Sequence, residues 1–162
     1  MAFEAYCKIP GITGESTAAG FEGQTALTSV QWSASQAGSM QQATGGGVSS
    51  ANLSDLTYTH YMDSSSPAIF QACVTGQHFA TVTICVRKAG GDALVYCTYT
   101  LTDCIISGIS WSGGGGDNDL ITQHTSVNFA QFQIEYQPQD KTGAKKGGSV
   151  KAGYNAALRK KI

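Results

Sequence analysis

The sequence has little charge for a soluble protein. Only 13% of its 162 residues are Asp, Glu, Lys or Arg, whereas about 25–35% is usual on the surface of a small soluble domain. Its surface is therefore expected to consist largely of Ser, Thr, Gln and backbone groups. Because charged residues are depleted where protein surfaces meet, the shortage favours a chain that assembles with itself over a free monomer.

Basic residues are scarce in the first 136 positions, where Lys8, Arg87 and Lys88 stand against ten acidic residues, a net charge of −7. The segment 137–162 holds seven basic residues and only Asp140, a net charge of +6. This basic tail is either simply solvated or it meets the acidic body of a neighbouring copy and steers head-to-tail association. Nucleic acid is not an expected partner, because the acidic body repels phosphate.

Long apolar runs are also missing. No stretch reaches the roughly 18–20 apolar residues of a membrane span, and no cationic start with an apolar segment begins the chain. We expect no signal peptide and no membrane insertion, and a protein that starts in the cytoplasm. The five cysteines are odd in number and lack a CxxC pair, which favours buried thiols over a disulfide framework or a zinc site.

Motifs that carry chemistry are absent as well. His60, His78 and His124 lack the spacing of a metal site, and Asp117–Asp119 lacks the glycine and the distal glutamate of a calcium loop. The Gly45–Gly47 run is not followed by the Lys-Ser/Thr pair of a phosphate-binding loop. No serine has the GxSxG surroundings of a hydrolase nucleophile. We therefore expect no catalytic residue, no metal and no cofactor.

The pattern that is present is period-two alternation interrupted by glycine, which predicts β-strands and turns. The expected strands are Phe3–Ile9, Thr25–Ser35, Leu53–Tyr61, Phe79–Ala89, Asp92–Thr102, Ile105–Trp111, Ile121–Tyr136 and Tyr154–Ile162. One helix is expected at about 66–75, with Ser66 as its cap, Pro67 at its first position and Gly76 after its end. The predicted fold is all-β, a small barrel of two packed antiparallel sheets with one short flanking helix. It forms a single domain over 1–162, with an extended loop at 38–52 and the basic segment 137–162.

Two local patterns predict which side chains face the core. A two-residue Gly90-Gly91 turn would place Val86 opposite Val95 and Ile84 opposite Cys97. Along Thr25–Ser35, the set expected to face the core is Ala26, Thr28, Val30, Trp32 and Ala34. The set expected to face outward is Ser29, Gln31 and Ser33, which are polar but uncharged.

Several segments together resemble the haemolysin-coregulated proteins. The matching segments, in family order, are Ile9–Ser16, Gln36–Met40, Ser66-Pro67, Ala72–Gly76, Val86–Gly91, Val127–Ala130 and Tyr136–Gln139. The resemblance runs nearly end to end. The departures from the family pattern are Cys85, Cys97, Cys104 and Trp111, which affect local packing and not the fold.

The resemblance implies a structural subunit and not an enzyme. Members of the family form hexameric rings that stack into the inner tube of the bacterial type VI secretion system, with effectors in the lumen, a spike protein at the tip, and sheath and baseplate proteins around it. It implies export by that system without a signal peptide. It also implies a lumen lined by Ser29, Gln31 and Ser33. The implied ring-stacking loop includes Gly38, Ser39, Met40, Gly45, Gly46 and Gly47. The alternatives are a small secreted effector enzyme such as a hydrolase, and a monomeric binding module.

Overall fold

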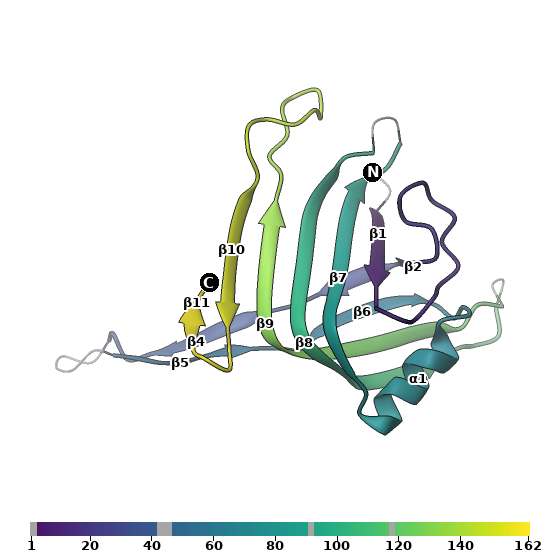
Figure 1. Cartoon of the computed structure of the whole chain (residues 1–162), viewed down its shortest axis with the longest axis horizontal. Coiled ribbons are helices and arrows are strands. Elements are labelled where there is room, and N and C mark those ends of the chain that lie inside the picture. Colours follow the sequence, from purple (N-terminus) through teal and green to yellow (C-terminus); the bar gives the residue numbers. More distant parts are fainter. Residues whose placement is uncertain (1–2, 42–46, 91–92, 117–118) are drawn as a thin grey trace.

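The structure is a computed structural model that describes residues 3–41, 47–90, 93–116 and 119–162, with the backbone only at 48 and 49. Its strands are β1 (Phe3–Lys8), β2 (Thr25–Leu27), β3 (Ser29–Gln31), β4 (Ala34–Gly38), β5 (Val48–Leu53), β6 (Leu56–Tyr61), β7 (His78–Lys88), β8 (Val95–Ser112), β9 (Thr122–Tyr136), β10 (Val150–Asn155) and β11 (Lys160–Lys161). The described part has a single helix, α1 (Ser66–Thr75). The expected all-β class is confirmed (Figure 1).

Most strands belong to one antiparallel sheet that folds over on itself. Its hydrogen-bonded order is β11-β10-β9-β8-β7-β1-β2, and β6 and β3 continue from β9. One edge of β9 serves two neighbours, because β6 pairs with residues 122–127 and β10 pairs with residues 131–136. The long strands β8 and β9 therefore run through both halves of the sheet. The two halves meet at an angle where β8 and β9 bend (Figure 1).

The bend shows as a change of face along each long strand. Residues three apart on a regular strand point to opposite faces, yet Leu101 and Cys104 on β8 are both buried. Between them Asp103 has a φ of 55°, a left-handed conformation that Asp tolerates better than most residues. On β9, Phe129 and Phe132 are likewise both buried. The two expected strands Asp92–Thr102 and Ile105–Trp111 are therefore one bent strand.

The core lies between the two halves of the folded sheet. Its most deeply buried side chains are Leu56, Tyr58, Ile69, Val82, Ile84, Leu101, Cys104 and Val127. The helix α1 contributes Ile69 and Ala72 to this core. It ends at Gly76, whose φ of 65° is left-handed as expected. The Gln77 amide donates to the Ala72 carbonyl, which closes the helix end. At its start the cap position is Ser65, so the assignment of Ser66 as the cap is wrong by one residue.

The segment Thr25–Ser35 is divided among three strands. β2 pairs with β1, and β3 pairs with β6. Leu27 is buried while Ala26 and Thr28 are exposed, so the expectation that Ala26 and Thr28 face the core is wrong. The alternation changes phase at the junction at Thr28, whose amide donates to the Thr59 carbonyl. Beyond it, Val30 and Trp32 pack against the core as predicted, whereas Ala34 lies exposed in β4.

The β7–β8 hairpin has a different register from the one predicted. Val86 lies opposite Cys97 and Ile84 opposite Tyr99, a shift of two residues. β7 ends at Lys88 and β8 begins at Val95, so the connection is longer than a two-residue Gly90-Gly91 turn. Gly91 and Asp92 lie outside the described residues. A shift of two preserves side-chain facing, and Val82, Ile84 and Val86 are buried as predicted.

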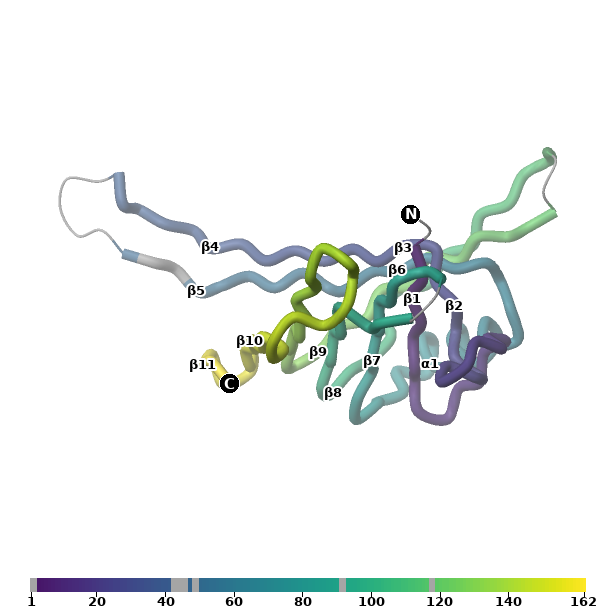
Figure 2. The backbone as a smooth tube through the Cα atoms, turned by 90° about the horizontal axis from the view of Figure 1, so that it is seen from above, coloured from purple at the N-terminus to yellow at the C-terminus, as the bar shows by residue number. Residues whose placement is uncertain are grey.

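Within the described residues the sheet does not close into the expected barrel. The hydrogen-bonded path ends at β11 on one side and at β2 on the other. The C-terminal segment, expected as the strand Tyr154–Ile162, folds back as a β10–β11 hairpin. β4 and β5 form a separate two-stranded sheet, which extends far from the body of the molecule (Figure 2). The extended loop was expected over 38–52, whereas residues 48–52 belong to β5 and residues 42–46 lie outside the described part.

Candidate assembly surface

A flat polar surface covers the outer side of four paired strands. β3, β6, β9 and the end of β8 pair so that Ser29, Thr59, His124 and Ser110 form one row across them. We call this surface the hydroxyl face. It consists of Ser29, Gln31, Thr57, Thr59, Tyr61, Ser110, Ser112, Thr122, His124 and Ser126. All of these side chains are exposed or half-exposed, and none of them is Asp, Glu, Lys or Arg.

Three hydroxyl groups of this face have hydrogen-bond partners within it. The Ser29 and Thr59 side-chain oxygens are 2.5 Å apart. The Thr57 hydroxyl donates to the backbone carbonyl of Gln31 at 3.3 Å. Hydroxyls that already have partners offer few free groups to a passing molecule. The surface is polar, and it carries no Asp, Glu, Lys or Arg side chain.

Two of the three expected lumen residues, Ser29 and Gln31, belong to the hydroxyl face. Ser33 is exposed but lies beyond the end of β3, where its hydroxyl donates to the Ser54 hydroxyl at 3.2 Å. It therefore sits at the base of the β4–β5 hairpin. The members from β6, β8 and β9 were not identified from the sequence. Their signal was the same alternation of small polar residues, but only strand pairing brings them together.

One acidic group lies beside this face. The Asp55 carboxylate accepts a hydrogen bond from the Ser107 hydroxyl at 2.6 Å and another from the Asn128 amide at 2.8 Å. Hydrogen bonds of this kind satisfy the carboxylate oxygens. Asp55 thus links β8 and β9 at the end of β6.

A buried polar cluster lies on the inner side of the same strands. The Trp111 indole donates to the Gln123 side-chain oxygen at 2.9 Å, and the Gln123 amide donates to the Thr125 hydroxyl at 2.9 Å. Trp111, one of the departures from the family pattern, thereby satisfies a fully buried amide. Burial lowers the pKa of His60, which keeps its ring neutral near pH 7. Buried polar groups with specific partners fix one register, so the cluster keeps β6, β8 and β9 aligned under the hydroxyl face.

The cysteines occupy mostly inner positions. Cys7, Cys97 and Cys104 are buried, Cys73 and Cys85 are half-buried, and all five are free thiols. Burial is the main cause that raises the pKa of Cys7 to about 12. It likewise raises the pKa of Cys104 to about 11. Thiols held protonated in this way are poor nucleophiles and poor metal ligands.

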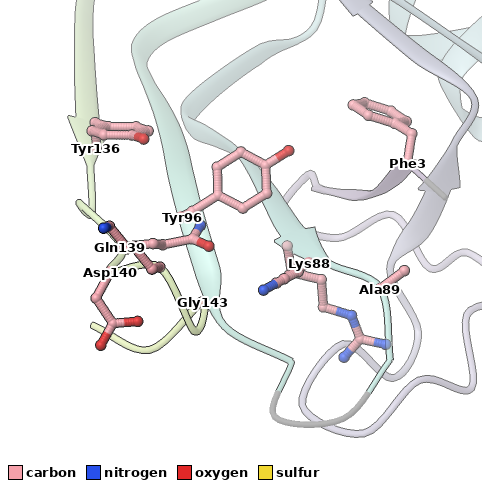
Figure 3. A pocket seen from close by; sticks show the side chains of 10 residues that line it. Phe3, Lys88, Ala89, Tyr96, Tyr136, Gln139, Asp140 and Gly143 are labelled. Carbon is pink, nitrogen blue, oxygen red and sulfur yellow. The ribbon is translucent and has the colours of Figure 1, made fainter. Parts of the chain in front are cut away.

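A cavity of about 550 Å³ opens where β7 ends and β8 begins. In Figure 3, Tyr136, Gln139 and Asp140 come from one side of it, and Phe3 and Ala89 come from the other. The Asp140 carboxylate is engaged by the Thr142 amide and hydroxyl, which lowers its pKa. The residues that line the cavity include no His, Ser or Cys, so they offer no Ser–His or Cys–His pair.

The three histidines do not share one site. His60 is buried, His124 belongs to the hydroxyl face, and His78 pairs with Asp103 at 3.4 Å. In the part of the chain that the structure describes, no three His, Cys, Asp or Glu side chains are grouped as a metal site would need. α1 is too short to cross a bilayer, and the described residues form no other helix.

The expected stacking loop forms the end of the β4–β5 hairpin. Gly38 ends β4, and the Ser39 amide donates to the Gly47 carbonyl at 3.1 Å. Met40 is 76% exposed at this distant position. Gly45 and Gly46 lie outside the described residues. The hairpin thus carries an exposed apolar side chain well away from the core.

Comparisons with known proteins agree with this architecture. The family described as "Type VI secretion system effector, Hcp" matches residues 6–136. "Protein hcp1" of Pseudomonas aeruginosa is 44% identical over 105 residues. That match covers 64% of this chain, and the chain spans 64% of the length of this curated relative.

Solved structures match over more than nine-tenths of the chain. A structure described as a type six secretion system protein has a TM-score of 0.93 and 29% identity, and the match covers 99% of this chain and 100% of the other. Hcp1 from Salmonella typhimurium has a TM-score of 0.83 and 29% identity, with full coverage of both chains. A type VI secretion system effector from Yersinia pestis has a TM-score of 0.72 and 26% identity, covering 93% of this chain and 98% of the other. The resemblance seen in the sequence is confirmed, and the chain belongs to the Hcp family of type VI secretion system proteins.

Proposed function

We propose that the protein is a structural subunit of the inner tube of a type VI secretion system, with the hydroxyl face toward the lumen. Six copies form a ring, and rings stack into the tube. The single observation that carries this proposal is the hydroxyl face, an exposed surface over four strands whose side chains carry no fixed charge. An exterior surface of this kind suits a channel through which varied cargo passes without sticking.

The rest of the assembly follows from the family. The expected partners are further copies of the chain, the spike protein, the sheath and baseplate proteins, and secreted effectors. The protein leaves the cell through the type VI machinery. The extended β4–β5 hairpin supports a role in ring stacking, because it projects an exposed Met40 beyond the body.

The alternatives have less support. A hydrolase needs a nucleophile and a base that converge in a cavity, and the 550 Å³ cavity is lined by no Ser–His or Cys–His pair. A monomeric binding module does not explain the sparse surface charge.

Thiol labelling tests the lumen assignment. A Gln31→Cys variant, assembled into rings, is treated with a small thiol reagent and with one too large to enter the ring, and labelling at position 31 is followed by mass spectrometry. We expect fast labelling by the small reagent and slow labelling by the large one. Ser149→Cys, in the exposed loop before β10, is the matched control that both reagents should label. Equal labelling of position 31 by both reagents would show that the channel assignment is wrong.

A further inference from the structure

One flank of the molecule carries exposed apolar side chains around α1. Phe70 of α1 lies beside Trp111 of β8, with ring centroids 5.7 Å apart. Val74 follows one turn along the helix, and the Met62 amide donates to the Ile121 carbonyl. We call these five residues the helix-side patch. Their exposed fractions lie between 40% and 64%.

Two acidic residues adjoin this patch in the sequence. Asp63 follows Met62, and Asp119 stands two positions before Ile121. No basic residue occurs between Lys8 and Arg87 or between Lys88 and Lys141, so the segments that form the patch carry no positive charge of their own. An exposed apolar patch rimmed by polar or charged groups is typical of a protein interface.

The C-terminal hairpin, residues 150–162, combines exposed apolar side chains with basic ones. Its exposed apolar residues are Val150, Leu158 and Ile162. Lys151 lies 3.6 Å from Glu135. Within the described part of the chain, no carboxylate lies within ion-pair distance of Arg159, Lys160 or Lys161. These three charges are available to a partner.

The hairpin is also held in a defined shape. The Asn155 side-chain oxygen accepts a hydrogen bond from the Leu158 amide at 2.8 Å, and the Ala156 amide donates to the Ala130 carbonyl. Ile162 packs directly over Gly153, because a Cβ placed on Gly153 would meet it at 2.6 Å. A preorganised element loses little conformational entropy when it binds.

The two surfaces lie on opposite sides of the molecule. Figures 1 and 2 both show β10 and β11 on one side, and α1 and the connection between β8 and β9 on the other. A contact between two different surfaces of one chain repeats from copy to copy and generates a ring where the rotation closes. This is the arrangement that the proposed ring requires.

We propose that the C-terminal hairpin of one copy docks on the helix-side patch of the next copy. This inference rests on the proposed ring and names the contact that builds it. In this contact Leu158 and Ile162 cover Phe70 and Trp111. Buried aromatic residues commonly dominate the binding energy of an interface, so Phe70 and Trp111 are its expected anchors. Arg159, Lys160 and Lys161 face the acidic rim, and this complementary charge sets the direction of association.

Charge reversal tests the contact. The full-length wild type, a Lys160→Glu/Lys161→Glu variant and a Lys145→Glu/Lys146→Glu variant are diluted in steps, and their mass is followed by light scattering. The two double variants make the same change in net charge, but Lys145 and Lys146 lie in the exposed loop before β10. A Val74→Glu variant tests the apolar half of the contact from the other side, and circular dichroism confirms that each variant is folded.

We expect the Lys160→Glu/Lys161→Glu and Val74→Glu variants to fall apart at concentrations about tenfold higher or more, which corresponds to about 1.4 kcal/mol. The Lys145→Glu/Lys146→Glu variant should assemble as the wild type does. If the wild type and all variants assemble alike, the inference is overturned while the proposed function stands. If the wild type itself remains a monomer at tens of micromolar, the proposed ring fails and the contact with it.

Discussion

At the scale of a single residue, a substitution at Gln31 tests whether the hydroxyl face lines the lumen. Its backbone carbonyl is held by Thr57, while its side chain is exposed on an uncharged surface. We predict that Gln31→Arg leaves the ring intact and changes which effectors are retained, because a new positive charge attracts or repels cargo by about 0.2–1 kcal/mol per copy. Co-purification of effectors with the ring measures this change. Ser149→Arg is the control, and an identical effector profile for Gln31→Arg and the wild type would count against a lumenal position.

Cys7 makes a separate prediction about stability at high pH. Burial raises the pKa of its thiol from 9.0 to about 12. Below pH 9 the thiol is protonated in both the folded and the unfolded chain, so it has no effect on stability. Between pH 9 and 12 only the unfolded chain ionises readily, and the free energy of unfolding therefore falls as the pH rises. For this one thiol the loss between pH 9 and 10 is about 1 kcal/mol.

Urea unfolding at pH 8, 9 and 10 measures this effect. A Cys7→Ala variant should lose less stability between pH 9 and 10 than the wild type, although it starts from a lower value because of the cavity left in the core. Cys73→Ala, on α1, is a matched control that keeps the buried Cys7 thiol. If Cys7→Ala shows the same pH dependence as the wild type, the buried thiol is not responsible.

At the scale of elements, the β4–β5 hairpin is the part of the chain proposed to stack rings, as distinct from the part that forms them. It forms its own two-stranded sheet, so its end can change without disturbing the main sheet. We predict that deleting Gly45–Gly47 leaves rings intact and abolishes secretion, because ring stacking loses its contact. Secretion into the medium and light scattering of the purified variant measure the two effects. Normal secretion after the Gly45–Gly47 deletion would mean that this loop is incidental.

At the scale of the whole molecule, the sparse charge and the two unlike flanks predict a closed ring with cyclic symmetry. Identical subunits joined by a head-to-tail contact close only when each presents two different surfaces. Negative-stain images of the purified protein should show annular particles. Their absence at concentrations where light scattering reports only a monomer would contradict the ring.

The sequence by itself determined the class of fold and the facing of most side chains. Alternation along Phe79–Thr102 placed Val82, Ile84 and Val86 in the core, and this held although the register shifted by two residues. Side-chain facing has a period of two, so it survives an error of that size. The helix and its left-handed Gly76 were also predicted, because Pro at the start and Gly after the end act within one turn.

The tertiary structure decided what depends on residues far apart in the sequence. The bend at Asp103 joins two expected strands, and the junction at Thr28 reverses the facing of Ala26. Both are imposed by wrapping the sheet around a shared core, which local alternation does not encode. The hydroxyl face needs β3, β6, β8 and β9 side by side, and the acidic and basic flanks oppose each other only because β10 and α1 lie at opposite sides of the folded chain. Strand pairing is a nonlocal choice among many alternating segments. Alternation along one strand therefore predicted that Ser29 and Gln31 face outward, whereas the fold decided which residues surround them.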